Sequence, residues 1–168
     1  NKACAIADEM CLTLLRTSRS VFVNEAADFA IALADTKGEV FGWAPENKTT
    51  SVHPPCAKTI EAVGLLEPGD VIITNDPYSS HGLSTHLPDL HLIQPYFHQG
   101  TIVAYGWAFI HFMDVGGRVP GSITRSNHDI FQEGLRIPPM KLVKKGVLNE
   151  DFLCVFMANC RLPEINMR

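Results

Sequence analysis

Residues 90–110 read LHLIQPYFHQGTIVAYGWAFI, and the predicted fold is built around this stretch. Residues 90–97 alternate apolar with other side chains, and residues 101–110 form a long apolar run. His98, Gln99 and Gly100 lie between them and have the composition of a tight turn. The pattern predicts two antiparallel strands joined as a hairpin.

Shorter runs on the N-terminal side of this hairpin predict more strands. The turn Thr36-Lys37-Gly38 is typical of a second hairpin, and Asn75-Asp76-Pro77 ends a β-branched run sharply. The segments expected to be strands are residues 20–23, 28–34, 39–43 and 71–74. They favour a largely antiparallel sheet.

Helical periodicity appears in three segments. Apolar residues recur at three- and four-residue steps over residues 3–15. Pro54 and Pro55 are expected to open a helix over 56–63, with His53 before them as a hydrogen-bonded loop residue. Asn149 is expected to cap a helix over 150–160. Glycine-rich residues 116–122 are expected to be loop, and residues 127–134 to hold one helical turn.

These elements predict one domain over residues 1–168, of the mixed α/β (α+β) class, with a largely antiparallel or mixed sheet and flanking helices. The chain begins at Asn1 inside a helical pattern and reaches Arg168 without a stop signal. Charged residues make up 19% of the chain, below the usual share of about 25%. We therefore expect a fragment of a larger subunit that belongs to an assembly.

Composition argues against several classes of protein. The net charge is −4, and the lysines at 141, 144 and 145 are the densest basic group, so nucleic acid and anionic membranes are not expected partners. The sequence contains neither a run of about 18 apolar residues nor a signal-peptide pattern. The five cysteines show no C-x-x-C spacing, which suits reduced thiols. A cytoplasmic protein is expected.

Metal-competent side chains gather at the ends of the predicted strands. The segments are Asn75-Asp76-Pro77, residues 85–89 (THLPD) and residues 111–114 (HFMD). Two imidazoles and one or two carboxylates can hold Zn, Mn or Fe as a Lewis acid. Each residue also has an ordinary explanation, because Asp76 can stabilise a turn and a single histidine can be a hydrogen-bonded core residue. Spacing alone leaves both alternatives open.

Other catalytic patterns are weaker. Residues 116–122 spell G-x-x-x-x-G-S, without the lysine of a phosphate-binding loop. The chain contains no G-x-S-x-G motif, and none of its cysteines lies in an electropositive segment.

Several long motifs, in order, resemble the hydantoinase B/oxoprolinase family. They are GDVIITNDPY (residues 69–78), THLPD (85–89), HFMDVGGRVPGS (111–122) and FQEGLRIPPMKL (131–142), supported by EAADFA (25–30), GVLNED (146–151) and ANCRLPE (158–164). The resemblance covers nearly the whole chain.

This resemblance implies a catalytic subunit that works in a hetero-oligomer with a hydantoinase A-type subunit. That partner would bind ATP and activate a cyclic amide such as a hydantoin or 5-oxoproline, and a divalent metal in this subunit would activate the water that opens the ring. The related acetone and acetophenone carboxylases carry a metal in the corresponding subunit. The alternatives are a subunit of an ATP-dependent ketone carboxylase and a non-catalytic scaffold.

The motif match also assigns residues. Asp76, His86, His111 and Asp114 are the expected metal ligands, and the last three of these are the expected catalytic residues. Asp89 is expected to be a metal ligand, to orient His86 or to contact the substrate. Gly116, Gly117 and Arg136 are further candidates for substrate binding.

One position departs from the family pattern. The family often has two adjacent histidines where this chain has His111-Phe112. Neighbours on a strand face opposite sides, so only one of the two positions can point at a given site. If the ligand position were the second, the assignment of His111 would fail.

Overall fold

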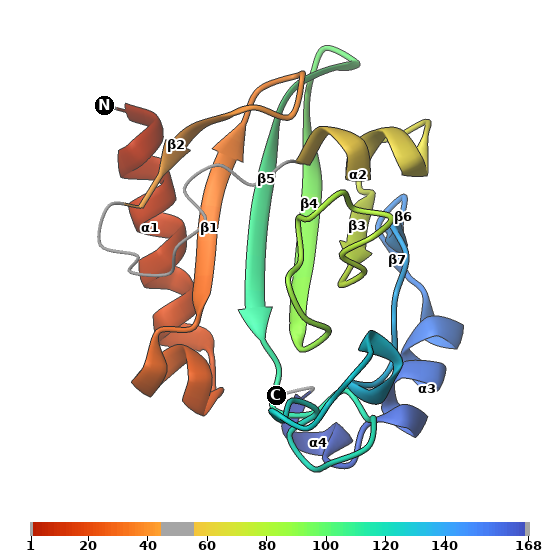
Figure 1. The fold of residues 1–168 in the computed structure, drawn as a ribbon. Coiled ribbons are helices and arrows are strands. Elements are labelled where there is room, and N and C mark those ends of the chain that lie inside the picture. The colour runs from red at the N-terminus through yellow and green to blue at the C-terminus, as the bar shows by residue number, and fades with distance from the viewer. Residues whose placement is uncertain (1, 45–55, 167–168) are drawn as a thin grey trace.

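The computed structural model describes residues 2–44 and 56–166, which form a seven-stranded sheet with helices on both faces (Figure 1). Neighbouring strands are antiparallel, in the order β2-β1-β5-β4-β3-β6-β7. The strands are β1 Phe29–Ala34, β2 Val40–Trp43, β3 Val71–Thr74, β4 Asp89–His98, β5 Thr101–His111, β6 Met140–Lys144 and β7 Val147–Leu148. The helical elements are α1 Lys2–Thr17, η1 Phe22–Ala26, α2 Cys56–Val63, η2 Ile130–Gln132, α3 Glu150–Asn159 and α4 Pro163–Asn166. The expected fold class is confirmed.

The hairpin predicted from residues 90–110 forms the middle of the sheet. β4 and β5 pair along their whole length, beginning with Asp89 opposite His111. Gln99 and Gly100 have positive φ angles of 48° and 78°, as a two-residue type I′ turn requires. The side chains of Asp89 and His111 therefore lie on the same face, at the end of the hairpin away from its turn.

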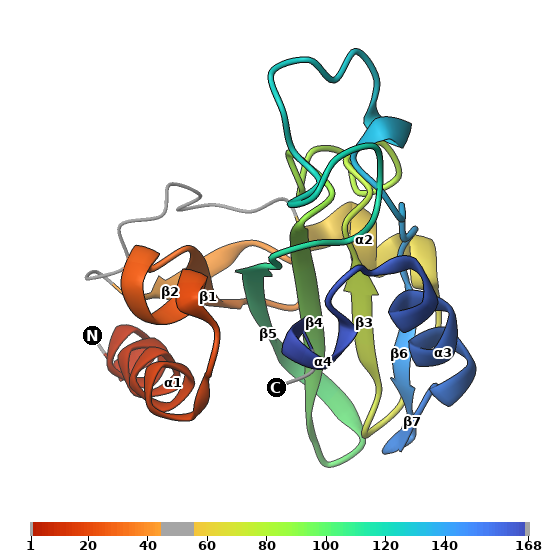
Figure 2. The same cartoon turned by 90° about the horizontal axis from the view of Figure 1, so that it is seen from below.

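Three apolar clusters hold the helices to the two faces of the sheet. α2 packs on the face that includes Ile72 and Trp107. α1 and α3 pack on the opposite face, α1 over Ile31 and α3 over Ile73 (Figure 2). Ile72 and Ile73 belong to different clusters because successive side chains of a strand point to opposite faces.

The predicted strand over residues 20–23 is wrong. Residues 21–26 are helical and include η1, and Ala27, which follows it, has a left-handed φ of 53°. Val23 is fully buried in the cluster beneath α1. Packing of this side chain outweighs the strand preference of a β-branched residue.

Most other predicted elements are confirmed, including the helical turn η2 and the cap of α3, where the Asn149 side chain accepts a hydrogen bond from Phe152 N. β6, β7 and α4 were not predicted, because lysines interrupt the apolar pattern of the two strands and α4 has only four residues. His53, Pro54 and Pro55 lie outside the described residues.

None of the described helices has the length and apolar character needed to cross a membrane.

Asn75 joins three segments at the end of β3. Its Nδ2 donates hydrogen bonds to Leu87 O at 2.7 Å and Leu135 O at 2.9 Å, and its Oδ1 accepts one from Ile137 N at 2.6 Å. The residue is fully buried. These bonds satisfy backbone groups that would otherwise be buried without partners.

Asp70 has a similar role at the start of β3. Its carboxylate lies 2.7 Å from Lys141 Nζ and accepts hydrogen bonds from Glu67 N and Lys145 N. Burial raises the pKa of Asp70, but these hydrogen bonds outweigh it and hold the pKa below its usual value. Folding therefore favours the ionised carboxylate.

We expect Asn75→Asp to destabilise the fold by about 2–4 kcal/mol at neutral pH, because a carboxylate would face two carbonyl oxygens. Urea unfolding followed by circular dichroism measures the change. Asn24→Asp is the matched control, because Asn24 makes an exposed hydrogen bond to Ser18 O. An Asn75→Asp protein as stable as the control would contradict this role.

The contribution of Asp70 should depend on pH. Its folded pKa lies below the unfolded value of about 3.9, so its stabilisation is complete above that value and is lost as the pH falls through the folded pKa. The free energies of unfolding of wild type and Asp70→Asn should differ by about 1–3 kcal/mol at pH 7. Unfolding curves between pH 3 and pH 7 should show the two proteins converging on the acid side; a constant difference would refute this.

Candidate functional site

Three adjacent strands bring polar side chains to one edge of the sheet. His111 ends β5, and Asp89 pairs with it at the start of β4. Asp28 precedes Phe29, whose partner on β5 is Ile110, and Asp28 O accepts a hydrogen bond from His111 N. The register therefore places Asp28, His111 and Asp89 in one row across β1, β5 and β4.

His86 joins this row from the turn before β4. Its Nε2 lies 3.1 Å from Asp89 Oδ1 and 3.4 Å from His111 Nδ1. His111 Nδ1 lies 2.9 Å from the same Asp89 oxygen and 3.6 Å from Asp28 Oδ2. Potential ligand atoms of His86, Asp89 and His111 all lie within 4.8 Å of one another. We call these three residues the His–Asp cluster.

The His–Asp cluster places an ionised carboxylate between two imidazoles. Burial raises the pKa of Asp89, but the hydrogen bonds with His111 and His86 outweigh it and lower the pKa to about 2. The hydrogen bond with Asp89 raises the pKa of His86 above its usual value, against the effect of burial. The carboxylate is thus ionised near neutral pH, with two imidazoles against it.

The cluster has the donor chemistry of a divalent metal site. Ligand atoms at about 2.0–2.2 Å from an ion are about 2.8–3.6 Å apart in octahedral or tetrahedral geometry. The three separations within the cluster, 2.9, 3.1 and 3.4 Å, fall in this range. Imidazole nitrogen with carboxylate oxygen suits Zn, Mn or Fe. These residues therefore fit such an ion, with Asp28 beside them as a further carboxylate.

The structure brings together two of the four ligands expected from the sequence, His86 and His111. Asp114 instead closes the loop after β5, where it accepts hydrogen bonds from the backbone amides of Gly116 and Gly121 and pairs with Arg161 at 3.0 Å. Asp114 thus lies outside the cluster, although it was expected to be a catalytic residue and a ligand. The site roles of His86, His111 and Asp114 stay predictions.

Asp76 also lies outside the His–Asp cluster. Its carboxylate accepts hydrogen bonds from Tyr78 N and Ser79 Oγ and lies 3.8 Å from Arg136 Nε. The guanidinium of Arg136 packs over the rings of Phe131 and Tyr78, 5.1 and 5.8 Å from their centres. The turn-stabilising alternative therefore accounts for the contacts of Asp76.

Gly116 and Gly117, expected to approach a substrate, approach other backbone instead. A Cβ on Gly116 would lie 2.6 Å from Asn159 O, and one on Gly117 would overlap the backbone of residues 132–133. Close packing of loops explains both glycines. Substrate binding by Asp89, Gly116, Gly117 and Arg136 stays a prediction.

Asp28 is the residue of this row that sequence reasoning missed. It occurs within the motif EAADFA, where it was assigned to a strand with no chemical role. It lies immediately before the buried strand β1, much as Asp89 lies at the very start of β4. This parallel was the signal available in the sequence.

The position that differs from the family pattern has a clear geometry. His111 points to the His–Asp cluster, whereas Phe112 packs edge-on against Phe156 of α3 on the other face of the sheet. The two side chains contact different parts of the fold, as expected of neighbours at a strand end, and the role of His111 in a site stays a prediction. In this chain the histidine occupies the position that faces the cluster.

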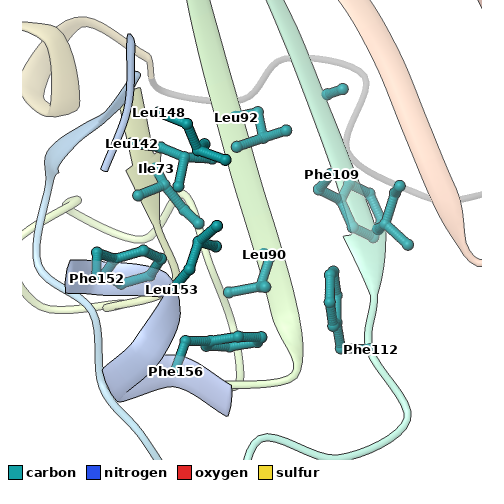
Figure 3. A pocket seen from close by; sticks show the side chains of 12 residues that line it. Ile73, Leu90, Leu92, Phe109, Phe112, Leu142, Leu148, Phe152, Leu153 and Phe156 are labelled. Atoms are coloured by element: carbon teal, nitrogen blue, oxygen red, sulfur yellow. The ribbon is translucent and has the colours of Figure 1, made fainter. Parts of the chain in front are cut away.

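Two cavities border these strands. An apolar cavity of about 320 Å³ lies between the sheet and α3, and none of the three cluster residues lines it (Figure 3). A second cavity, of about 260 Å³, borders His111 and is lined by both hydroxyl and apolar side chains. The residues lining this second cavity are Leu14, Thr17, Ser18, Ser20, Ile110, His111, Phe112, Met113 and Ile165. Polar chemistry therefore suits the cavity beside His111 and not the apolar one.

Several enzymes with assigned activities are similar to this chain in sequence or in structure. The 5-oxoprolinase of Saccharomyces cerevisiae is 36% identical over 155 residues, which cover 88% of this chain and 12% of that protein. The ATP-dependent caprolactamase from Pseudomonas jessenii matches with a TM-score of 0.80 at 31% identity, over 95% of this chain and 28% of that chain. A nucleotide-free acetone carboxylase has a TM-score of 0.84 at 19% identity, over 99% of this chain and 22% of that chain, which shows a shared fold.

The similar proteins are much longer than this chain. It spans between 12% and 29% of the length of the curated relatives it matches. The family model described as hydantoinase B/oxoprolinase matches residues 1–168, so the resemblance seen in the sequence motifs is confirmed. This chain belongs to the hydantoinase B/oxoprolinase family.

Proposed function

We propose that this chain forms the metal-binding part of an ATP-dependent enzyme that opens a cyclic amide by hydrolysis. The observation that carries the proposal is the convergence of His86, Asp89 and His111 at one edge of the sheet. These three residues would hold the ion, and Asp28 would supply a further oxygen ligand from β1. This set replaces Asp76 and Asp114 with Asp89 and Asp28.

The chemistry follows from the ion and its surroundings. A divalent cation would polarise the amide carbonyl and lower the pKa of water near it. His86 Nε2 and His111 Nδ1 both lie beside Asp89 Oδ1, at 3.1 and 2.9 Å, so the three atoms that would hold the ion are already gathered. The cavity of about 260 Å³ beside His111 has room for a small ring, with hydroxyl groups to orient it.

Relatives support the choice of substrate class. 5-Oxoproline and caprolactam, named in the relatives, are both cyclic amides, and the caprolactamase is described as ATP-dependent. Residues 116–122 lack the lysine of a phosphate-binding loop. ATP would therefore bind to a hydantoinase A-type partner in a hetero-oligomer, and the name caprolactamase subunit beta fits such a division of labour.

Neither alternative function gains an observation of its own. The likeness to acetone carboxylase, at 19% identity, concerns the fold and does not favour ketone carboxylation. A scaffold role leaves the two imidazoles gathered on one carboxylate without an explanation.

The first test is metal content of the intact protein by plasma mass spectrometry. We expect near-stoichiometric metal in the wild type and a large loss in His86→Ala, His111→Ala and Asp89→Asn, because the first two remove an imidazole ligand and the third replaces the carboxylate with a neutral amide. Asp76→Asn should keep its metal, and His98→Ala serves as the matched control because His98 is exposed at the end of β4, next to the hairpin turn.

Two results would overturn this assignment. A folded Asp76→Asn protein that loses metal as fully as Asp89→Asn would reject the revised ligand set. A wild type that cannot be loaded with Zn, Mn or Fe would reject the metal site itself.

The second test is activity in the assembled complex. With the partner subunit and ATP, we expect ring opening of 5-oxoproline, a hydantoin or caprolactam, and its loss in His86→Ala but not in His98→Ala. Substrate loss followed by chromatography measures it. Consumption of bicarbonate with a ketone, in place of ring opening, would establish the carboxylase alternative.

A further inference from the structure

Two side chains from distant parts of the sequence hold both backbone groups of Leu87. Glu133 Oε2 accepts a hydrogen bond from Leu87 N at 2.9 Å, and Asn75 Nδ2 donates one to Leu87 O at 2.7 Å. The Leu87 side chain is fully buried in the cluster beneath α3. Leu87 is thus fixed at three points, and it directly follows His86.

We propose that Glu133 is a positioning residue that fixes the backbone at Leu87 and so aims the imidazole of His86 at Asp89 and His111. This inference rests on the proposed metal-binding role of His86. It assigns a function to the glutamate of the FQEG segment, for which the sequence alone suggested none.

Glu133 is itself held firmly. Residues 132–135 lie against residues 115–118, where Arg118 N donates to Gln132 O at 2.7 Å and Leu135 N donates to Val115 O at 2.8 Å. Gly117 and Gly134 permit this approach, because a Cβ on either would overlap the opposite backbone. The turn before β4 and the segment that carries η2 lie side by side in both views (Figures 1 and 2). The carboxylate of Glu133, carried by these packed segments, can therefore define the position of Leu87 N.

The remaining bonds of the turn do not replace this contact. Ser84 Oγ donates to His86 O at 2.8 Å, which ties the turn to itself. Thr85 Oγ1 lies 3.2 Å from His86 Nδ1, a contact that can fix the rotation of the imidazole ring about the Cβ–Cγ bond. Asn75 and Glu133 both connect the turn to another part of the fold, and Glu133 is the one that accepts the hydrogen bond from Leu87 N, next to His86. Groups that support a ligand in this way typically change metal affinity about 10- to 100-fold when removed.

The test compares Glu133→Ala with Glu133→Gln, because glutamine keeps an acceptor oxygen for Leu87 N and removes the charge. Zn²⁺ and Mn²⁺ are titrated separately into the metal-free intact protein, and exchange of the Leu87 amide is followed at single-residue resolution. We expect Glu133→Ala to bind metal at least about 10-fold more weakly and to exchange Leu87 faster. Glu133→Gln should restore most of both. Glu9→Ala, at an exposed position of α1, is the matched control.

Other results would overturn the inference. Unchanged metal affinity in Glu133→Ala despite faster Leu87 exchange would mean that the bond does not aim His86. Equal loss of affinity in Glu133→Gln, with Leu87 still protected, would mean that the charge matters and the position does not.

Failure of the proposed metal function is separable from failure of this inference. If the wild type binds neither ion, the metal-free protein still reports through the nuclear Overhauser contact between the rings of His86 and His111, whose centres are 5.3 Å apart. Loss of that contact in Glu133→Ala, with rescue in Glu133→Gln, would uphold positioning; an unchanged contact would refute it.

Discussion

The antiparallel register of β4 and β5 is the constraint on which the rest of the molecule depends. Pairing of Asp89 with His111 fixes the face taken by the side chains of the two strands as far as Tyr96, where the register shifts, because the pleat repeats every two residues. The same register places Leu90 and Ile110 on the opposite face, among the clusters beneath α1 and α3. A slip of one residue would turn the polar pair into the apolar clusters and move Leu90 and Ile110 to the face of the His–Asp cluster, so the core and the candidate site require the same alignment.

Buried carboxylates in the described residues divide into two kinds by their partners. Asp70 and Asp114 each accept hydrogen bonds from backbone amides and face a lysine or an arginine. The amides stay neutral and the cations stay charged at physiological pH, so the partners of these two carboxylates do not titrate. Asp89 is surrounded by imidazoles instead, which can release a proton and bind a metal. Partner chemistry, more than burial, separates the structural acids from the candidate ligand.

The sequence predicted the fold well where local periodicity was strong. The central hairpin, α1, α2 and α3 follow from spacing of apolar residues and from turn and cap residues close in sequence. It could not tell ligands from structural acids, since Asp76, Asp89 and Asp114 all lie at strand ends. Their roles depend on partners that are remote in sequence, such as Arg161 for Asp114. Asp28 escaped notice for the same reason, because its proximity to His111 arises from pairing of β1 with β5.

The glycines that let residues 115–118 and 132–135 pack backbone to backbone have a consequence for ligand binding. Two loops joined by amide–carbonyl hydrogen bonds cannot open independently, so the ordering of the segment that supports His86 is complete once the chain has folded. A ligand bound at His86, as proposed, would lose less of its binding free energy to ordering that support. Selectivity among ligands would then come from a preorganised site that accepts a narrow range of ligand shapes, and not from a loop that adapts to each ligand.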